Sequence, residues 1–159
     1  ILGPRTPIEF YSADDWELTM RINVSAAFLL TKYLLPFLKK SMDGRVLFTS
    51  SSVGRKARGL WGADAVSKFA LEGLMQVLAD ELDNTSKIRI NSLNPGGIRT
   101  SMRRTAYPAE NPSANPPPEV LMPLYLYLFS PESRNINGES LNFKDFNPSI
   151  YSRPAQSDE

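Results

Sequence analysis

Side chains that could perform acid–base chemistry occur close together in this sequence. A serine run, residues 50–52, ends an apolar stretch, and Asp64 and Lys68 follow it. Residues four apart on a helix share one face, so Asp64 and Lys68 would lie about one turn apart. The simplest interpretation is structural, because serines after a strand often cap turns and an exposed ion pair of this spacing contributes only about 0.3–0.5 kcal/mol. The alternative is an active site for proton transfer.

The residue types that are missing narrow this chemistry. The chain has no histidine and no cysteine. This excludes Ser-His-Asp hydrolysis, cysteine nucleophiles, disulfides and metal sites built from His or Cys. Acid–base chemistry must therefore use Asp, Glu, Lys, Tyr or Ser, and we expect no metal site. The lack of disulfides is compatible with a reducing compartment, and we expect a cytoplasmic protein.

Length and charge exclude further classes of partner. A chain of 159 residues can form one domain with a hydrophobic core. The 18 basic and 17 acidic residues leave a net charge of +1, so we expect neither nucleic acid nor a membrane surface as a partner. No apolar run of about 18 residues is present to span a bilayer. The first residues lack the features of a signal peptide and an initiator Met, which favours a piece of a longer chain.

Helical and strand patterns alternate along the chain. Ser12 begins a capping-box pattern, and the apolar residues after it recur at three- and four-residue steps. The patterns predict a helix at about 13–40, a strand at 45–50, a helix at about 61–83, a strand at 88–93, a helix at about 119–129 and a strand near 140–143. This order is typical of an α/β fold with a parallel sheet.

Two stretches lie outside these elements. The segment from about 100 to 118 is rich in Pro, Asn and Ser and is long for a structureless loop, which favours a lid or a binding loop. Residues 148–159 form the expected loose tail, so residues 1–147 form the expected domain. Three strands make a thin sheet for helices on both faces, which suggests that the sheet is incomplete.

Five stretches are similar to the C-terminal part of the short-chain dehydrogenase/reductase family, and especially to its YciK-type branch. They are INVSAAFLLT, VLFTSSSVGR, the WGA–SKFA–EG–MQVLADE helix, NPGGIRTSMR and MPLYLYL. They occur in the family's order and spacing from Ile1 to about Phe143. The resemblance implies a Rossmann-like, doubly wound parallel sheet. It also implies hydride transfer between NAD or NADP and a carbonyl or alcohol substrate.

The resemblance assigns catalytic positions. The family's Asn, Ser, Tyr and Lys fall on Asn23, Ser51, Asp64 and Lys68, where Ser51 is selected because it lies 13 residues before the tyrosine position. In the family, the tyrosine gives a proton to the alkoxide, the serine holds the carbonyl oxygen, and the lysine lowers the tyrosine pKa. Asn23 and Lys68 would support a proton path to solvent. Without the family, Asn23 is more simply a hydrogen-bonded structural residue on an apolar helix face.

The resemblance also assigns part of a cofactor site. Lys68 would bind the cofactor ribose. A motif that contacts the nicotinamide end falls on Pro95, Gly96 and Thr100, and Ile98 would contribute main-chain atoms. The family's glycine-rich TGxxxGxG loop does not occur in these 159 residues. Because the cofactor pyrophosphate needs that loop, we expect the chain to bind NAD or NADP poorly.

Aspartate at the tyrosine position should impair catalysis. A carboxyl group has a reference pKa of about 4, so Asp64 would have no proton to give near neutral pH. An ion pair with Lys68 would hold it ionised, and its side chain is shorter than that of tyrosine. We therefore expect carbonyl reduction near background. The alternative is a non-catalytic module, a pseudoenzyme or dimerisation unit related to the family.

The resemblance also predicts partners. In the family, two basic segments border the substrate cleft, and here they contain Arg55, Lys56, Arg58, Arg99, Arg103 and Arg104. They would suit an anionic small-molecule carbonyl or alcohol substrate, although a solvated basic rim is the simpler interpretation. Family members usually dimerise through two long helices, here at about 13–40 and 61–83. We therefore expect a homodimer.

Overall fold

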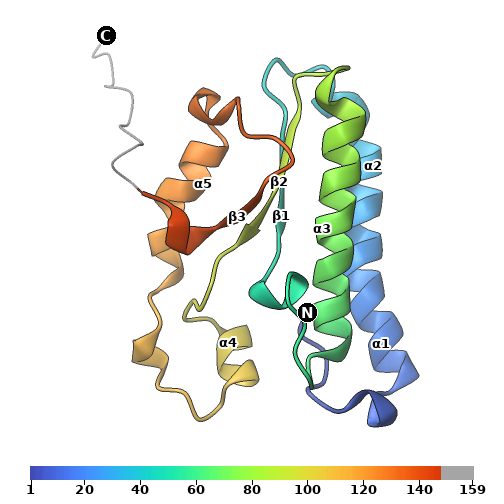
Figure 1. The fold of residues 1–159 in the computed structure, drawn as a ribbon, viewed down its shortest axis with the longest axis vertical. Helices are drawn as coiled ribbons and strands as arrows, with labels where there is room; N and C mark the ends of the chain where they lie inside the picture. The colour runs from blue at the N-terminus through green and yellow to red at the C-terminus, as the bar shows by residue number, and fades with distance from the viewer. Residues whose placement is uncertain (148–159) are drawn as a thin grey trace.

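A computed structural model describes residues 1–147 and has the predicted α/β order (Figure 1). Its sheet is parallel, with the strand order β1-β2-β3. The strands are β1 (Arg45–Thr49), β2 (Arg89–Asn94) and β3 (Ser140–Asn142). Within the described residues, β1 therefore has a neighbour on one side only and forms an edge of the sheet. The tail expected from residue 148 onward lies outside the described residues.

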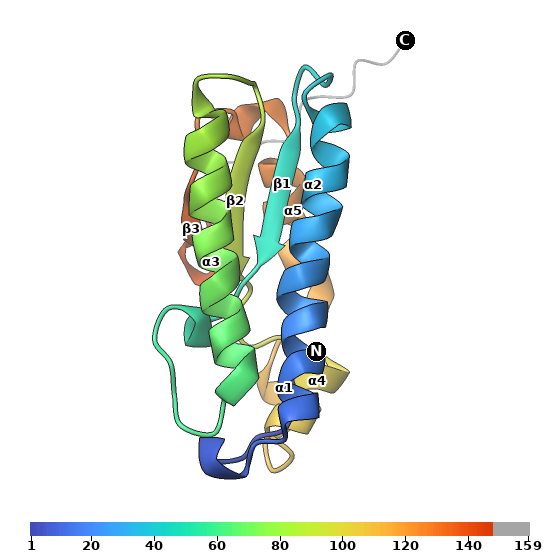
Figure 2. The ribbon, with the colours of Figure 1, turned by 90° about the vertical axis from the view of Figure 1, so that its right-hand side faces the viewer.

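Helices cover both faces of this sheet (Figures 1 and 2). One layer contains α1 (Ala13–Met20), α2 (Ala26–Leu38) and α3 (Gly62–Asp83). The other face is covered by α5 (Met122–Leu128), and α4 (Ser101–Ala106) lies beyond the carboxyl ends of the strands. This is the Rossmann-like arrangement predicted from the sequence.

The alternation of side chains along β2 builds a core on each face. Ile90 is fully buried and belongs to the cluster under α3, which includes the fully buried Met75. Leu93 is also fully buried, but it belongs to the cluster that contains Leu124 of α5. Ser92 shares the face of Ile90, so β2 presents one polar group to α3.

The helix predicted at about 13–40 is interrupted. Residues Arg21–Ser25 form a π-helical turn between α1 and α2, and this turn buries Asn23. The prediction of one continuous helix was wrong at this point. Apolar residues spaced three and four apart indicate an α-helix and give no sign of a single wider turn within it. Such turns are often found at functional sites.

The segment expected to be a lid or binding loop contains regular structure. Thr100 caps α4, because its Oγ1 accepts a hydrogen bond from Arg103 N at 3.1 Å. Two 3-10 turns follow, Pro112–Ala114 and Pro118–Leu121. The helix predicted at about 119–129 therefore begins as a 3-10 turn and becomes α-helical at Met122.

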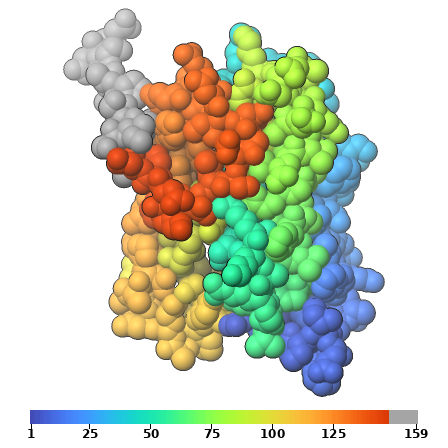
Figure 3. All heavy atoms as spheres, in the orientation of Figure 1, coloured from blue at the N-terminus to red at the C-terminus, as the bar shows by residue number. Residues whose placement is uncertain are grey.

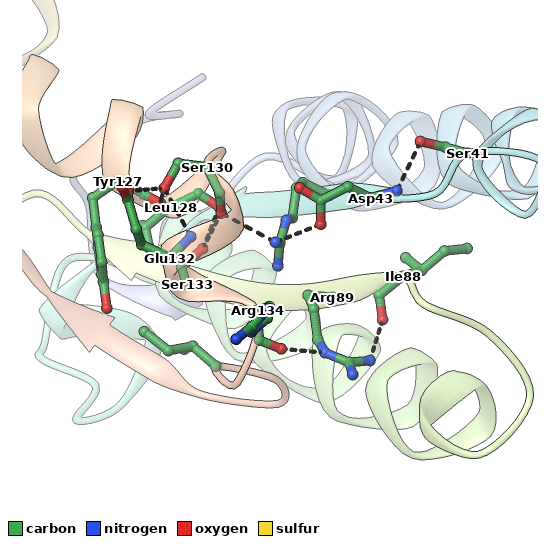
Figure 4. A network of polar contacts seen from close by, with 12 residues as sticks. Ser41, Asp43, Ile88, Arg89, Tyr127, Leu128, Ser130, Glu132, Ser133 and Arg134 are labelled. Carbon is green, nitrogen blue, oxygen red and sulfur yellow. Dashed lines mark hydrogen bonds and ion pairs between the residues drawn. The ribbon is translucent and has the colours of Figure 1, made fainter. Parts of the chain in front are cut away.

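Arginines fix the opposite end of the sheet, where the strands begin. Arg45 and Arg89 are register partners on β1 and β2. Arg45 pairs with Asp43 at 2.5 Å and donates to the carbonyl oxygen of Ser130 at 3.1 Å. Arg89 Nε donates to the carbonyl oxygen of Arg134 at 2.7 Å (Figure 4). These bonds join the starts of two strands to the connection between α5 and β3.

No helix in the described part of the chain has the length and apolar character needed to cross a membrane.

Candidate active site

The predicted site residues lie near the carboxyl ends of β1 and β2. Open α/β sheets bind ligands outside this edge. Ser51 follows β1 and Gly96 follows β2, and both line one cleft of about 400 Å³. Figure 3 shows this hollow between the segment that follows β1 and the segment that contains α4. The structure thus brings two of the sequence-predicted residues to one cavity.

Within the serine run, Ser51 faces the cleft and Ser50 does not. Ser50 is 3% exposed and does not line the cavity. Ser51 is half-buried, and its Oγ accepts a hydrogen bond of 3.4 Å from Val53 N in the 3-10 turn Ser52–Gly54. Ser52 also lines the cleft. The Ser51 hydroxyl is therefore available to a ligand while its position is fixed by the turn.

Asp64 and Lys68 lie in the first two turns of α3, but they do not form the expected ion pair. Lys68 Nζ instead donates to the carbonyl oxygen of Thr49 at 3.0 Å. Asp64 is 5% exposed, and burial raises its pKa against the opposing effect of the Lys68 ammonium. Burial likewise lowers the pKa of Lys68, with Asp64 opposing. The expected ion pair is absent, and the loss of solvation affects the pKa of Asp64 more than the Lys68 ammonium does.

Asn23 lies beside the same part of α3. Its Nδ2 donates to Ser67 Oγ at 3.0 Å and to the carbonyl oxygen of Ile1 at 2.8 Å. Ser67 Oγ donates in turn to the carbonyl oxygen of Asp64 at 2.7 Å. The π-helical turn is thereby joined to the start of α3. These bonds satisfy the buried amide and fix its position relative to Asp64 and Lys68.

The turn that carries Ser51 packs tightly against Lys68 through Gly54. A Cβ at Gly54 would lie 2.6 Å from Lys68 Cβ, which is closer than real Cβ contacts. Gly54 was not singled out from the sequence, although a glycine in a turn after a strand can indicate close backbone approach. The close approach sets the distance between the β1 end and α3.

A buried carboxylate, Glu72 of α3, joins the turn to the sheet and was also not singled out. It is 6% exposed and accepts hydrogen bonds from Arg55 Nε at 3.0 Å, Ser92 Oγ at 2.7 Å and Ser140 Oγ at 2.6 Å. Burial alone would raise the pKa of Glu72, but hydrogen bonds from hydroxyls and from Arg55 outweigh it and hold the pKa below its ordinary value. The sequence did hold one indication of a buried carboxylate, because Glu72 lies four residues after Lys68 and among the apolar residues of the helix.

The residues expected to contact the nicotinamide end form a turn after β2. Gly96 has a φ of +75°, and its N–H donates to Asn94 Oδ1 at 3.0 Å. Ile98 is buried, and Thr100 caps α4. The exposed main chain at Gly96 fits one end of a dinucleotide, together with Ser51 of the cleft. The remaining phosphate-binding loop is not in the sequence, so these residues fit part of such a cofactor.

Basic residues contribute to the cleft less than expected. Three of the six predicted cations line it, namely Arg55, Arg58 and Arg103, and three do not, namely Lys56, Arg99 and Arg104. Arg103 is bound to Glu110 through Nε and Nη2, both at 2.6 Å. Lys144, which follows β3, also lines the cleft but was not predicted. The sequence could not place it, because the end of β3 meets the other strand ends only in the folded chain.

Comparisons with known proteins support this fold. The family model for short chain dehydrogenases matches residues 2–111. Together with the parallel sheet and the cleft at its carboxyl edge, this match shows that the chain belongs to the short chain dehydrogenase family.

Relatives within the family share most of the chain. It is 49% identical over 138 residues to the uncharacterized oxidoreductase YciK of Escherichia coli K12, an alignment that covers 87% of this chain and 54% of YciK. A short chain dehydrogenase structure from Pseudomonas syringae is 58% identical, with a TM-score of 0.88, and the match covers 89% of this chain and 57% of that one. An Escherichia coli CFT073 structure complexed with NADPH is 48% identical, with a TM-score of 0.86, and the match covers 89% and 58% of the two chains. The chain thus spans about half the length of the curated relatives it matches.

Proposed function

We propose that this chain carries the substrate side of a short-chain oxidoreductase site whose reaction is impaired by Asp64. The reaction is hydride transfer between NAD or NADP and a carbonyl or alcohol substrate. The observation that carries the proposal is the burial of Asp64 one helical turn from Lys68, at the carboxyl edge of a parallel sheet. NADPH in the Escherichia coli CFT073 relative supports this choice of cofactor.

Each polar residue has a role in the proposed reaction. The cofactor, when bound, supplies the hydride for the substrate carbon. The Ser51 hydroxyl holds the substrate oxygen, on which a proton must arrive as the alkoxide forms. Lys68 and Asn23 support proton transfer from solvent, and Lys68 also binds the cofactor ribose. Pro95, Gly96, Ile98 and Thr100 contact the nicotinamide end.

Asp64 is a poor substitute for a phenol in this scheme. Burial increases the fraction of Asp64 that carries a proton, which partly offsets the intrinsic acidity of a carboxyl group. Its side chain does not line the cleft formed by residues 1–147, however. A misplacement of about 1 Å can cost roughly a hundredfold in rate. The expected loss of activity therefore follows from the position of the Asp64 carboxyl group outside the cleft, and not from its charge alone.

Restoring the phenol tests this proposal. The cofactor-binding half of YciK would be joined to this chain, and NADPH oxidation would be measured with a set of ketones and aldehydes. We expect Asp64→Tyr to raise kcat by about a hundredfold or more. Equal activity of the two proteins would contradict the proposed role of Asp64. The chain alone should bind NADPH more weakly than micromolar, so a micromolar dissociation constant would contradict the expected cofactor defect.

The second candidate function is a non-catalytic association module. Large apolar side chains of α2 are exposed, among them Leu30 at 63%, Tyr33 at 67% and Phe37 at 68%, and Phe69 of α3 is 45% exposed. This surface supports the predicted homodimer through helices at about 13–40 and 61–83. Sedimentation should show a dimer that Phe37→Glu dissociates. A monomer at all concentrations would contradict the association role.

Two further predictions accompany this function. We infer that the substrate is anionic, because basic side chains line the cleft. The cytoplasmic location expected from the sequence stays a prediction, which fractionation of cells that express the chain would test.

A further inference from the structure

The charged side chains that line the cleft at the strand ends all carry a positive charge. Four cationic side chains line it, whereas no carboxylate among residues 1–147 does so. Two of these cations are neutralised from outside the cleft. Arg55 is paired with Glu72 at 3.0 Å, and Arg103 with Glu110 at 2.6 Å. Arg55 also donates to Asn142 Oδ1 at 2.7 Å, so its guanidinium is committed to the protein.

The other two cations, Arg58 and Lys144, keep their charge available. Both are exposed, and neither forms an ion pair within the described part of the chain. Arg58 follows the 3-10 turn that Ser51 caps, whereas Lys144 follows β3. They therefore reach the same cavity from two separate segments. An oxyanion that enters this cavity would displace no protein carboxylate from either cation.

One wall of the cleft is aromatic and held in place. Trp61 and Tyr107 both line the cavity, and their ring centroids are 5.8 Å apart. The guanidinium of Arg5 lies 4.6 Å from the Trp61 ring and 5.2 Å from the Tyr107 ring, a distance at which cations and rings attract. Arg5 does not line the cavity itself. The Arg103 guanidinium lies 3.9 Å from the Tyr107 ring, so Trp61 is the ring that offers a fixed apolar surface beside the two available cations.

We propose that the cleft selects an oxo acid, that is, a small carbonyl compound that carries a carboxylate. The carboxylate binds Arg58 and Lys144, the apolar body lies against Trp61, and the carbonyl group lies at Ser51. A volume of about 400 Å³ is within the usual range of small-molecule sites. This inference rests on the proposed function, and it names the substrate class and the two residues that select it.

Binding of a matched pair of probes to the 159-residue chain tests the inference without any catalysis. Levulinate carries a ketone and a carboxylate, and methyl levulinate has the same skeleton without the charge. The chain has two tryptophans, so its two indole N–H signals can be followed by NMR during each titration. We expect levulinate to shift the Trp61 signal and to leave the Trp16 signal in place. Methyl levulinate should bind about tenfold more weakly, as loss of two exposed charge contacts implies.

Charge-neutral variants identify the selecting residues. Arg58→Gln and Lys144→Gln should each weaken levulinate binding about threefold, and the double variant should bind the acid and the ester equally. Lys56→Gln is the matched control, because Lys56 is exposed in the same segment as Arg58 but does not line the cleft. It should leave levulinate binding unchanged.

The inference is overturned if the ester binds as tightly as the acid, if neither probe shifts Trp61, or if the double variant keeps its preference for the acid. These outcomes would also contradict the inferred anionic substrate, but they leave the proposed hydride transfer intact, since NADPH oxidation by the joined protein is measured separately. Conversely, charge-selective binding without any hydride transfer would contradict the proposed reaction and not the selectivity of the cleft.

Discussion

Gly54 lies directly against Lys68 at the point where the turn after β1 meets α3. A Cβ at Gly54 would lie 2.6 Å from Lys68 Cβ and 2.9 Å from its main-chain carbonyl carbon. The second atom is part of a helix backbone and cannot rotate away. The Ser51 turn and the Lys68 turn are therefore fixed relative to each other by the absence of one side chain. Because Lys68 also donates to Thr49, the end of β1 is held at two places.

Gly54→Ala should destabilise the chain and shift Ser51. Because the added methyl group must displace main-chain atoms, we expect the free energy of unfolding to fall by about 1–3 kcal/mol, as in other overpacked sites. Chemical denaturation measures this loss. Gly73→Ala in α3 is the matched control, since a Cβ there would meet no atom within 4 Å. It should stabilise the helix by about 0.5–1 kcal/mol, and similar losses in both variants would contradict the steric argument.

Glu72→Ala should be among the most destabilising single changes in α3. The substitution leaves Arg55, Ser92 and Ser140 without their shared acceptor. Removing one partner of a buried charged pair costs about 3–5 kcal/mol, and denaturant titration gives the value. Glu81→Ala, an exposed residue of the same helix, should change stability by less than about 0.5 kcal/mol. Equal effects of the two variants would show that the buried bonds do not stabilise the fold.

The same carboxylate should make stability depend on acid pH. Its pKa in the folded chain lies below the ordinary value of 4.5, so the folded state holds fewer protons than the unfolded state in that interval. The stabilisation from Glu72 is therefore fully present above about pH 4.5 and is lost as pH falls through the folded pKa. We expect the difference in Tm between the natural chain and Glu72→Gln to shrink on acidification. A difference that grows toward low pH would contradict this sign.

Asp64 should show the opposite pH dependence. Its folded pKa lies above the ordinary value of 3.8, because burial disfavours the ionised form. Between these values the folded chain keeps a proton that the unfolded chain has released, so stability falls as pH rises through the interval. The Tm of the natural chain relative to Asp64→Asn should therefore decrease as pH rises above about 4. A flat difference would show that Asp64 ionises as it does in water.

More of the fold than of the site could be predicted from the sequence. Periodicity located α3 and β2 within about one residue, since both bury regular apolar patterns. The π-helical turn around Asn23 has no such pattern. The shift in the pKa of Asp64 could not be predicted either, because a spacing of four residues predicts proximity to Lys68 but contains no information about burial. Lys144 and Arg58 share a cleft only because β3 lies beside β2, which is a tertiary relationship.

Arg5 should control the mobility of α4 beside the cleft. Its guanidinium contacts the rings of Trp61 and Tyr107 and donates to the carbonyl oxygen of Ala106, the last residue of α4. The N-terminal segment thereby holds α4 against the start of α3. We expect Arg5→Ala to raise hydrogen exchange in α4 by about fivefold or more, because a cation–π contact contributes on the order of 1 kcal/mol.

Exchange measured by mass spectrometry or NMR separates this local effect from a loss of global stability. Amides of β2 lie in the centre of the sheet and should exchange at unchanged rates. Arg104→Ala removes an exposed arginine of α4 that has no side-chain bond within residues 1–147, so it should leave α4 as it is. If Arg104→Ala loosens α4 as much as Arg5→Ala does, the contact with the two rings is not what holds the helix. If α4 alone responds to Arg5, the aromatic wall of the cleft depends on a residue outside it.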